Sequence, residues 1–403
     1  MKNFIIVLFS FTFICCSSKK NKESQVAKSN LLDSKIETKI VVAANQTEKY
    51  LSLLQGKSVG IVANQTSVIF KGEKNVHLVD SLISLDIKVV KVFAPEHGFR
   101  GKADAGEHVA DGIDAKTGLP IISLYGSNRK PSKNQLKGIE VMVFDIQDVG
   151  VRFYTYISTL HYVMEVCAEL NIPLIVLDRP NPNGHYIDGP MLEQEVKSFV
   201  GMHPVPTVYG MTIGEYGKMI NGEKWLENGI QCDLTVIPLK NYTHNSEYDL
   251  PIKPSPNLPN SKSINLYPSL CFFEGTNVSA GRGTEMQFQI FGSPFVSNNS
   301  FDFSFTPQPN FGAKHPKHEG KVCLGRDLRS TEKLSSLNLS WLIESYNNTE
   351  NKEKFFNKFF PKLAGTKKLQ TQIEQGLSSK EIKATWQKGI NGFKIVREKY
   401  TIY

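Results

Sequence analysis

The chain has 403 residues and a formal net charge of +8, with 40% hydrophobic and 21% charged residues. Beyond a short N-terminal segment, about 360 residues remain, which is more than one hydrophobic core usually supports, so two domains are expected. The positive excess favours polyanionic neighbours. The sequence has no zinc finger, RNP motif or basic helix, which argues against nucleic acid as the partner.

Residues 1–16 have the pattern of an export signal. Lys2 is followed by uncharged, mostly apolar residues from Phe4 to Ile14 and then by Cys15 and Cys16. The run is too short to span a bilayer, and a cysteine at the cleavage point is typical of a bacterial lipobox, with Cys16 lipidated. We therefore expect an exported lipoprotein, facing the periplasm or associated with the outer membrane. A plain secretory peptide cleaved nearby is the alternative.

The segment 17–45 is rich in Ser, Lys, Asn and Gln and is expected to be a disordered tether. An α/β domain is expected over 46–255 and a smaller α+β domain over 256–403. The boundary falls in the Pro-rich stretch "PIKPSPNLPN", which begins at Pro251 and is predicted to be a stiff linker.

Apolar, β-rich runs recur through the first of these domains and alternate with segments of helical period. The expected strands are 58–63, 89–93, 121–124, 141–145, 174–177 and 234–237. The clearest expected helices are 75–85 and 155–170. Unbroken apolar strands alternating with helices favour an α/β fold with a parallel sheet covered on both faces.

Polar residues follow five of these strands. Ligands of such sheets bind at the carboxyl ends of the strands, so these residues are candidate binding groups. They are Asn64, His97, Arg100, Asp148, Arg152, Arg179 and Asn181. The aromatic Tyr154 lies near the same ends of the strands and could stack on a sugar face. An arginine would suit a substrate carboxylate, although an internal salt bridge of Arg152 with Asp148, or of Arg179 with Asp178, is the simpler alternative.

Two carboxylates stand out near the second strand. Glu96 lies in "FAPEHGFRG", directly after a buried strand, where partial desolvation would suit a general acid. Glu107 follows in a Gly-rich stretch and could reach back over the same cleft. A pair of carboxylates suits glycoside hydrolysis. The alternative is that Glu96 pairs with Arg100 and that Glu107 is an ordinary loop residue.

Other chemistries have weaker signals. The histidines and cysteines lack the spacing of a metal site, no Gly-x-Ser-x-Gly elbow occurs, and no dinucleotide or Walker motif is present, so neither a metal nor a cofactor is expected. Four widely spaced cysteines follow the signal, at Cys167, Cys232, Cys271 and Cys323. For these, a disulfide and buried free thiols are equally open.

The smaller domain does not repeat the strand–helix alternation. Its stretch "CFFEGTNVSAGRGTEMQFQIFGSP", residues 271–294, predicts a strand at each end of a Gly-rich loop. The final helix is opened by a capping box at Ser378 and Glu381. Its apolar face carries Ile382, Trp386, Ile390 and Phe393. A cleft is expected between this domain and the ends of the strands.

Six motifs, in order, resemble the exported exo-β-N-acetylmuramidase family. They are "GIVANQTSV", "VFAPEHGFRG", "FDIQDVGVRFYTYISTL", "VLDRPNPNG", "PSPNLPN" and "FEGTNVSAGRGTE". The resemblance extends from about Glu48 to Tyr403. It implies a hydrolase that releases N-acetylmuramic acid from the non-reducing end of peptidoglycan fragments. It also implies a Rossmann-like N-terminal domain without a nucleotide, with the active site between the two domains.

Carried over residue by residue, the resemblance puts the catalytic carboxylates at Glu96 and Glu107. It puts Glu274, Asn277 and Arg282 on the opposite wall, and an arginine is expected to bind the lactyl carboxylate of muramic acid. The implied partners are peptidoglycan fragments, with a membrane reached through the lipid anchor. Two alternatives remain, a lipoprotein that binds muropeptides without turnover and a metal-dependent cell-wall deacetylase or amidase.

Overall fold

A computed structural model describes residues 39–101, 111–297 and 301–403 of the chain. The signal, most of the tether and Glu107 lie outside these residues, so the predictions for Cys16 and Glu107 stay predictions. No helix in the described ranges combines the length and apolarity that a membrane crossing requires.

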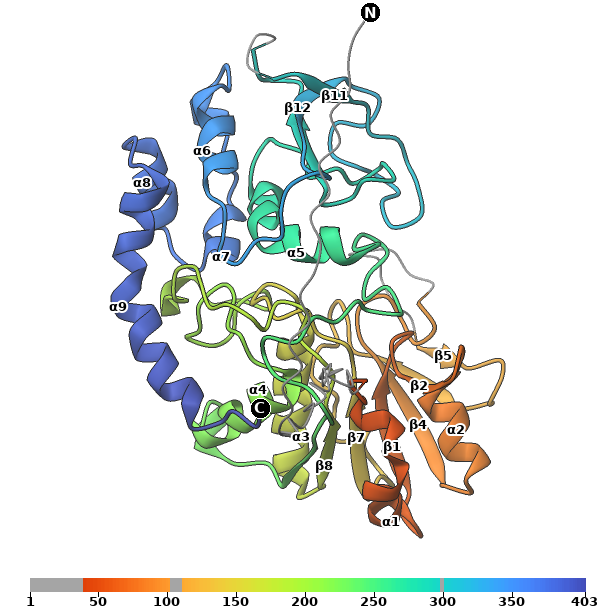
Figure 1. Ribbon diagram of the computed structural model, residues 1–403. Coiled ribbons are helices and arrows are strands. Elements are labelled where there is room, and N and C mark those ends of the chain that lie inside the picture. Colours follow the sequence, from red (N-terminus) through yellow and green to blue (C-terminus); the bar gives the residue numbers. More distant parts are fainter. Residues whose placement is uncertain (1–38, 102–110, 298–300) are drawn as a thin grey trace, which may run out of the picture. The chain divides into compact units, whose positions relative to one another are not determined.

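A seven-stranded sheet forms the first part of the fold (Figure 1), in the order β5-β6-β4-β1-β7-β8-β9. Its strands are β1 (Val59–Ala63), β4 (Val89–Ala94), β5 (Gly112–Ile113), β6 (Pro120–Ser123), β7 (Val141–Asp145), β8 (Leu174–Leu177) and β9 (Leu234–Ile237). All neighbours pair in parallel except β5 with β6. The six expected strands are confirmed. The chain builds outward from β1 on one side and then on the other, which is the Rossmann order with a topological switch between β1 and β7.

Each face of the sheet has its own core, because successive side chains of a strand point to opposite faces. Val62 and Phe144 pack with the helices α3 (Tyr156–Leu170) and α4 (Ile213–Gly222). Ile61 and Val143 pack on the other side with α1 (Leu51–Leu54) and α2 (Leu78–Ser84). Burial on both faces explains why these strands read as unbroken apolar runs.

The helix predicted over 75–85 is correct only in its second half. Residues 75–77 belong instead to β3 (Lys74–His77), which forms a hairpin with the preceding β2 (Val68–Lys71), turned at Gly72 with φ of 63°. The helix α2 then begins after His77, whose Nδ1 accepts a hydrogen bond from the Val79 amide at 3.3 Å. Val76 and Leu78 fit both periods, so the apolar pattern alone did not separate hairpin from helix.

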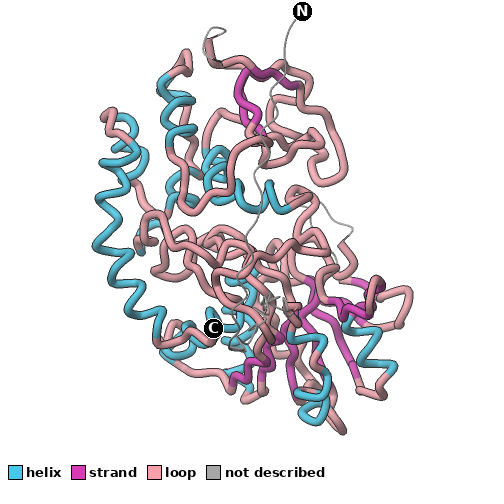
Figure 2. The backbone as a smooth tube through the Cα atoms, viewed as in Figure 1, coloured by secondary structure: helices cyan, strands magenta, loops and turns pink. Residues whose placement is uncertain are grey.

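The rest of the chain forms a second, smaller layer, in which the helices lie to one side of a three-stranded antiparallel sheet and below it (Figure 2). Its strands are β10 (Ile290–Ser293), β11 (Phe303–Phe305) and β12 (Cys323–Asp327). Its helices are α5 (Ser261–Leu270), α6 (Ser340–Asn347), α7 (Phe360–Ala364), α8 (Lys368–Glu374) and α9 (Ser379–Glu398). Short 3-10 turns occur in both parts of the fold. They are η1 (Ala43–Asn45), η2 (Thr47–Lys49), η3 (Gln194–Val196) and η4 (Glu227–Gly229) in the first part, and η5 (Cys271–Gly275) and η6 (Lys352–Lys354) in the second.

Two expectations for this layer meet different outcomes. The strand predicted at the start of 271–294 is wrong, because Cys271–Gly275 continues α5 as the turn η5; the strand at the end is β10. The capping box of α9 is confirmed, with the Ser378 amide donating to Glu381 Oε2 at 2.8 Å and the Glu381 amide to Ser378 Oγ at 3.3 Å. Its predicted apolar face is buried.

The Pro-rich stretch is packed and does not act as a free linker. Ser255, Asn257 and Leu258 within it are buried. Residues 39–403 form one compact unit, and one core joins Leu160 of α3 to Phe272 and Phe360 of the later layer. The question left open for the cysteines is answered among the described residues, where all four are buried free thiols.

Candidate active site

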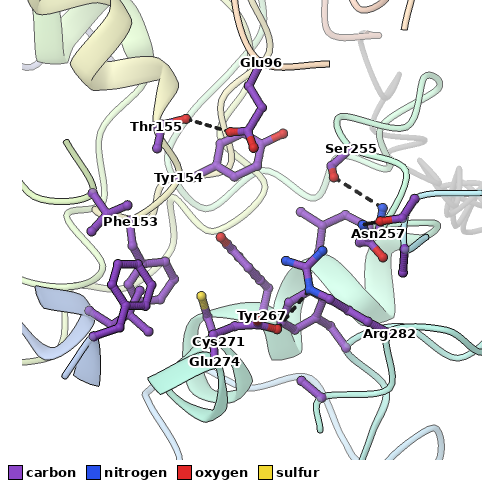
Figure 3. A pocket seen from close by; sticks show the side chains of 18 of the residues that line it. Glu96, Phe153, Tyr154, Thr155, Ser255, Asn257, Tyr267, Cys271, Glu274 and Arg282 are labelled. Atoms are coloured by element: carbon purple, nitrogen blue, oxygen red, sulfur yellow. Dashed lines mark hydrogen bonds and ion pairs between the residues drawn. The ribbon is translucent and has the colours of Figure 1, made fainter. Parts of the chain in front are cut away.

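A cavity of about 1000 Å³ lies at the carboxyl end of β4, against the smaller layer (Figure 3). The turn after β4 and the start of α3 form one wall. The Pro-rich stretch, the Gly-rich loop after η5, and residues 312–317 form the other. The cavity is at the upper end of the 300–1,000 Å³ range typical of small-molecule sites, which is roomy enough for a short glycan.

Glu96 stands at the β4 side of this cavity. The chain turns at Pro95, with the Gly98 amide donating to its carbonyl at 3.0 Å. His97 takes a φ of 72° in this turn, a left-handed conformation that non-glycine residues rarely adopt and that clusters at functional sites. Thr155 Oγ1 donates to Glu96 Oε2 at 3.1 Å, so the start of α3 steadies the carboxylate.

Aromatic side chains surround Glu96. Burial raises the pKa of Tyr125, and the charge of Glu96 and a hydrogen bond to it raise that pKa further, so this hydroxyl stays protonated and donates to the carboxylate. Tyr154 lines the cavity too, with its hydroxyl donating to the Pro254 carbonyl at 2.8 Å. Such rings offer flat faces on which sugars can stack.

The opposite wall carries an ion pair between Glu274 and Arg282. Arg282 Nε donates to Glu274 Oε1 at 2.9 Å, and its guanidinium carbon lies 5.1 Å from the centre of the Phe288 ring. Burial raises the pKa of Glu274, but the charges of Arg282 and Lys317 outweigh it and hold that pKa below its ordinary value. Glu274 is therefore ionised at neutral pH, and a donor of protons is not its role.

The cavity lining has an excess of positive charge. It contains five Lys or Arg residues against Glu96 and Glu274. The five are Arg129, Arg282, Lys314, Lys317 and Lys362. A concave surface with this balance attracts anionic ligands.

The ammonium of Lys317 is used within the protein, where it binds backbone carbonyls. Its Nζ donates to the carbonyls of Phe273, Thr276 and Val278 at 2.8, 2.7 and 3.0 Å. Burial lowers the pKa of this lysine, against the attraction of Glu274. It thus fixes the backbone that carries Glu274.

Several residues predicted to bind substrate do not line the cavity. Arg179 is buried and holds Asp145 through two hydrogen bonds of 2.6 and 2.8 Å. Arg152 is fully buried and donates to four carbonyls, those of Pro190, Val205, Leu363 and Ala364. The partners of Arg152 and Arg179 are therefore not Asp148 and Asp178, the acids expected from their nearness in the sequence. Parts of the chain that are distant in the sequence supply them instead.

The remaining predicted residues are engaged in the same way. Arg100 lies outside the lining and pairs with Asp80 and Asp114 at 3.1 and 2.7 Å. Asp148 is buried and accepts from Tyr209 and from the Gly150 amide. Asn64, Asn181 and Asn277 bond Tyr156, the Met211 carbonyl and Thr349, respectively. Of the predicted set, Glu96, His97, Tyr154, Glu274 and Arg282 do line the cavity.

The sequence reasoning missed Asn257 and Tyr267, which also line it. Asn257 is buried, and its Nδ2 donates to the Gly312 carbonyl at 2.7 Å. Tyr267 stacks edge-on against Phe288 at 4.9 Å. Asn257 belongs to the family motif "PSPNLPN", but the prolines of this stretch pointed to a linker and no site residue was predicted from it.

Among the described residues, one group of acids is close enough to hold a metal ion, namely Glu165, Glu169 and Glu227. The ammonium of Lys130 lies among them, 2.6 Å from each of the first two and 3.9 Å from the third. This lysine already supplies the positive charge, so the group has a structural role.

Comparisons with known proteins give a consistent picture. Residues 59–262 match the model for the N-terminal part of exo-beta-N-acetylmuramidase NamZ, and residues 265–403 match the model for its C-terminal part. The peptidoglycan beta-N-acetylmuramidase NamZ of Bacillus subtilis (strain 168) is 37% identical over 412 residues, which cover 97% of this chain and 96% of that protein.

Two crystal structures of DUF1343 family proteins from Bacteroides fragilis NCTC 9343 share the fold. One has a TM-score of 0.83 at 45% identity and covers 91% of this chain and 99% of its own. The other has a TM-score of 0.76 at 28% identity and covers 90% and 99%. With both family models matched in order over nearly all of the described chain, the protein belongs to the exo-β-N-acetylmuramidase NamZ family.

Proposed function

We propose that this protein is an exo-acting glycoside hydrolase that releases N-acetylmuramic acid from the non-reducing end of peptidoglycan fragments. The observation that carries this conclusion is the near full-length similarity to the Bacillus subtilis muramidase. The cavity fits the activity, because it combines a carboxylate on one wall, sugar-stacking rings and an excess of positive charge for a sugar acid.

Glu96 is the residue we assign to proton transfer. It is held by Thr155, faces the cavity and comes from the carboxyl end of a parallel strand. As general acid it would protonate the glycosidic oxygen while the sugar ring gains positive charge. We propose Glu107 as the second carboxylate, on its motif alone.

The test is to assay the purified protein on the disaccharide MurNAc-GlcNAc and on a nitrophenyl muramide. Release of free N-acetylmuramic acid and of nitrophenol, insensitive to EDTA, is expected. A folded protein that releases neither would contradict the proposal, and tight binding of the disaccharide in that case would identify a muropeptide-binding protein. Loss of activity with EDTA would instead favour a metal-dependent amidase or deacetylase.

We also propose that Cys16 carries a lipid that anchors the protein to a membrane. The support is the pattern of residues 1–16, an apolar run that ends at Cys15 and Cys16. Labelling with a fatty acid in cells should mark the full-length protein and leave the Cys16→Ala variant unmarked. A variant that is labelled equally, or a wild type that is never labelled, would point to a plain secretory signal.

A further inference from the structure

Arg282 has a feature that its ion pair with Glu274 leaves unused. That pair occupies only Nε, and within residues 39–101, 111–297 and 301–403 no other protein group binds the two terminal nitrogens. The side chain keeps 26% of its surface exposed, and Figure 3 shows the guanidinium extending into the space between Glu274 and Glu96. Two parallel N–H donors with a fixed direction match the two oxygens of a carboxylate.

The loop around Arg282 is built to hold this direction. Gly281 and Gly283 flank it with φ of 82° and 79°, in the left-handed region. A Cβ on Gly281 would lie 2.7 Å from Ile290 Cγ1, and one on Gly283 would lie 2.6 Å from Pro316 Cβ. Only glycine fits both positions, so the backbone can pass close to β10 and to the 312–317 loop while presenting a single arginine.

The other cations of the cavity are less suited to the same task. Lys317 spends its donors on three backbone carbonyls. Lys314, Lys362 and Arg129 are exposed, and Arg129 stacks on Phe199 at 4.4 Å. A charge in open solvent is screened and discriminates weakly, whereas a half-buried, oriented guanidinium retains its strength.

We propose that Arg282 is the residue that selects muramic acid, by binding the carboxylate of its lactyl group, and that Glu274 is a positioning residue that aims the guanidinium. This assignment rests on the proposed function. It adds to that function the residue by which the enzyme would distinguish a muramide from a glucosaminide. The two sugars differ only by the lactyl ether, so the carboxylate is the feature on which selection can act.

The test is a cycle that changes the protein and the substrate in turn. Wild type and Arg282→Gln are assayed on three nitrophenyl glycosides, the muramide, its lactyl methyl ester and the glucosaminide. For the muramide, Arg282→Gln should lower kcat/KM about 100-fold, the effect of losing a charge-assisted pair. For the ester and the glucosaminide it should change kcat/KM by less than about 3-fold, because neither offers a carboxylate.

The matched control is Arg326→Gln. Arg326 lies outside the cavity and has a similar ion pair and ring contact, with Nε 2.9 Å from Glu344 Oε2 and its guanidinium carbon 5.5 Å from the Phe301 ring centre. Unlike those of Arg282, its terminal nitrogens are engaged, by Glu344 and Asp302. Its loss should leave the ratio of muramide to glucosaminide hydrolysis unchanged. For the positioning role, Glu274→Gln keeps an acceptor for Nε and should raise KM for the muramide less than Glu274→Ala does, with the ester unaffected by either.

The outcomes separate the two proposals. If wild type hydrolyses none of the glycosides, the proposed function fails. If it hydrolyses the muramide and Arg282→Gln preserves its preference over the ester, or if the preference is lost in Arg129→Gln instead, the assignment of Arg282 is overturned while the function stands. Should Arg282→Gln fail to fold, Arg282→Lys replaces it in the cycle. A tenfold loss confined to the muramide is then expected, and wild-type behaviour overturns the assignment.

Discussion

The ionisable groups at the ends of β7 and β8 and those around the cavity are of the same residue types, yet they differ in how many of their polar atoms have hydrogen-bond partners within the protein. Arg179 binds Asp145 and the Val68 carbonyl, and Asp178 accepts from Thr212, Tyr403 and two backbone amides. Arg282, in contrast, uses Nε alone. A saturated buried network stabilises the fold, while a partly used group at a cavity wall is available to a ligand.

The comparison predicts that changes in the cavity alter activity without altering stability, and that changes in the network do the reverse. The largest effect on activity is expected for Glu96→Gln. Losing general acid catalysis should lower kcat by about 10²- to 10⁴-fold on the disaccharide. Release of N-acetylmuramic acid from the disaccharide measures the loss, and the urea midpoint checks the fold. A fully active Glu96→Gln protein would remove Glu96 from the mechanism.

Asp145→Asn should have the largest effect on stability. It leaves the Arg179 guanidinium buried without its counter-charge, which typically costs about 3–5 kcal/mol. Urea unfolding measures the loss, and the double variant Asp145→Leu with Arg179→Met should recover part of it. If the variant keeps its stability but loses muramide turnover, the comparison fails and Arg179 belongs to the substrate site.

Asp178 should make stability depend on pH. Burial raises its pKa from 3.8 to about 7, so the folded state keeps a proton that the unfolded chain releases near pH 4. The unfolded state then binds fewer protons, and the free energy of unfolding falls as pH rises from about 4 to about 7, by a few kcal/mol.

Urea unfolding of wild type and Asp178→Asn at pH 5 and pH 8 checks this. The stability difference between the two proteins should shift in favour of the variant at the higher pH. An unchanged difference would mean that Asp178 is ionised in the folded protein across the whole range.

The smallest effect is expected for Arg100→Gln. Arg100 is a quarter exposed and shares Asp80 with Lys116, so its loss should cost about 1–2 kcal/mol and leave kcat/KM within about 3-fold. Thermal unfolding and the muramide assay measure the two quantities. A large loss of activity at unchanged stability would return Arg100 to the set of substrate ligands.

The sheet was predictable because its strands are buried on both faces and leave unbroken apolar runs. The hairpin of β2 and β3 was not, since the four-residue strands of this separate two-stranded sheet carry too short a pattern to exclude a helix. Glu96 and Arg282 could be selected from their motifs. Arg179 could not be excluded, because its partner Asp145 is 34 residues away and only the folded sheet brings them together.

The reversal of strand order between β1 and β7 has a last consequence. Sheets of this order usually take a dinucleotide in the opening at that point. In this protein, hydrogen bonds join the segment after β1 to the end of β7. Ser67 Oγ donates to the Asp145 carbonyl, and the Gln147 amide donates to Thr66 Oγ1 at 3.0 Å. The cavity lies one strand over, at β4, where a second layer supplies the other wall. The strand order alone therefore does not locate the ligand site of this fold, because that site depends on which strand ends are closed by hydrogen bonds and which face a second wall.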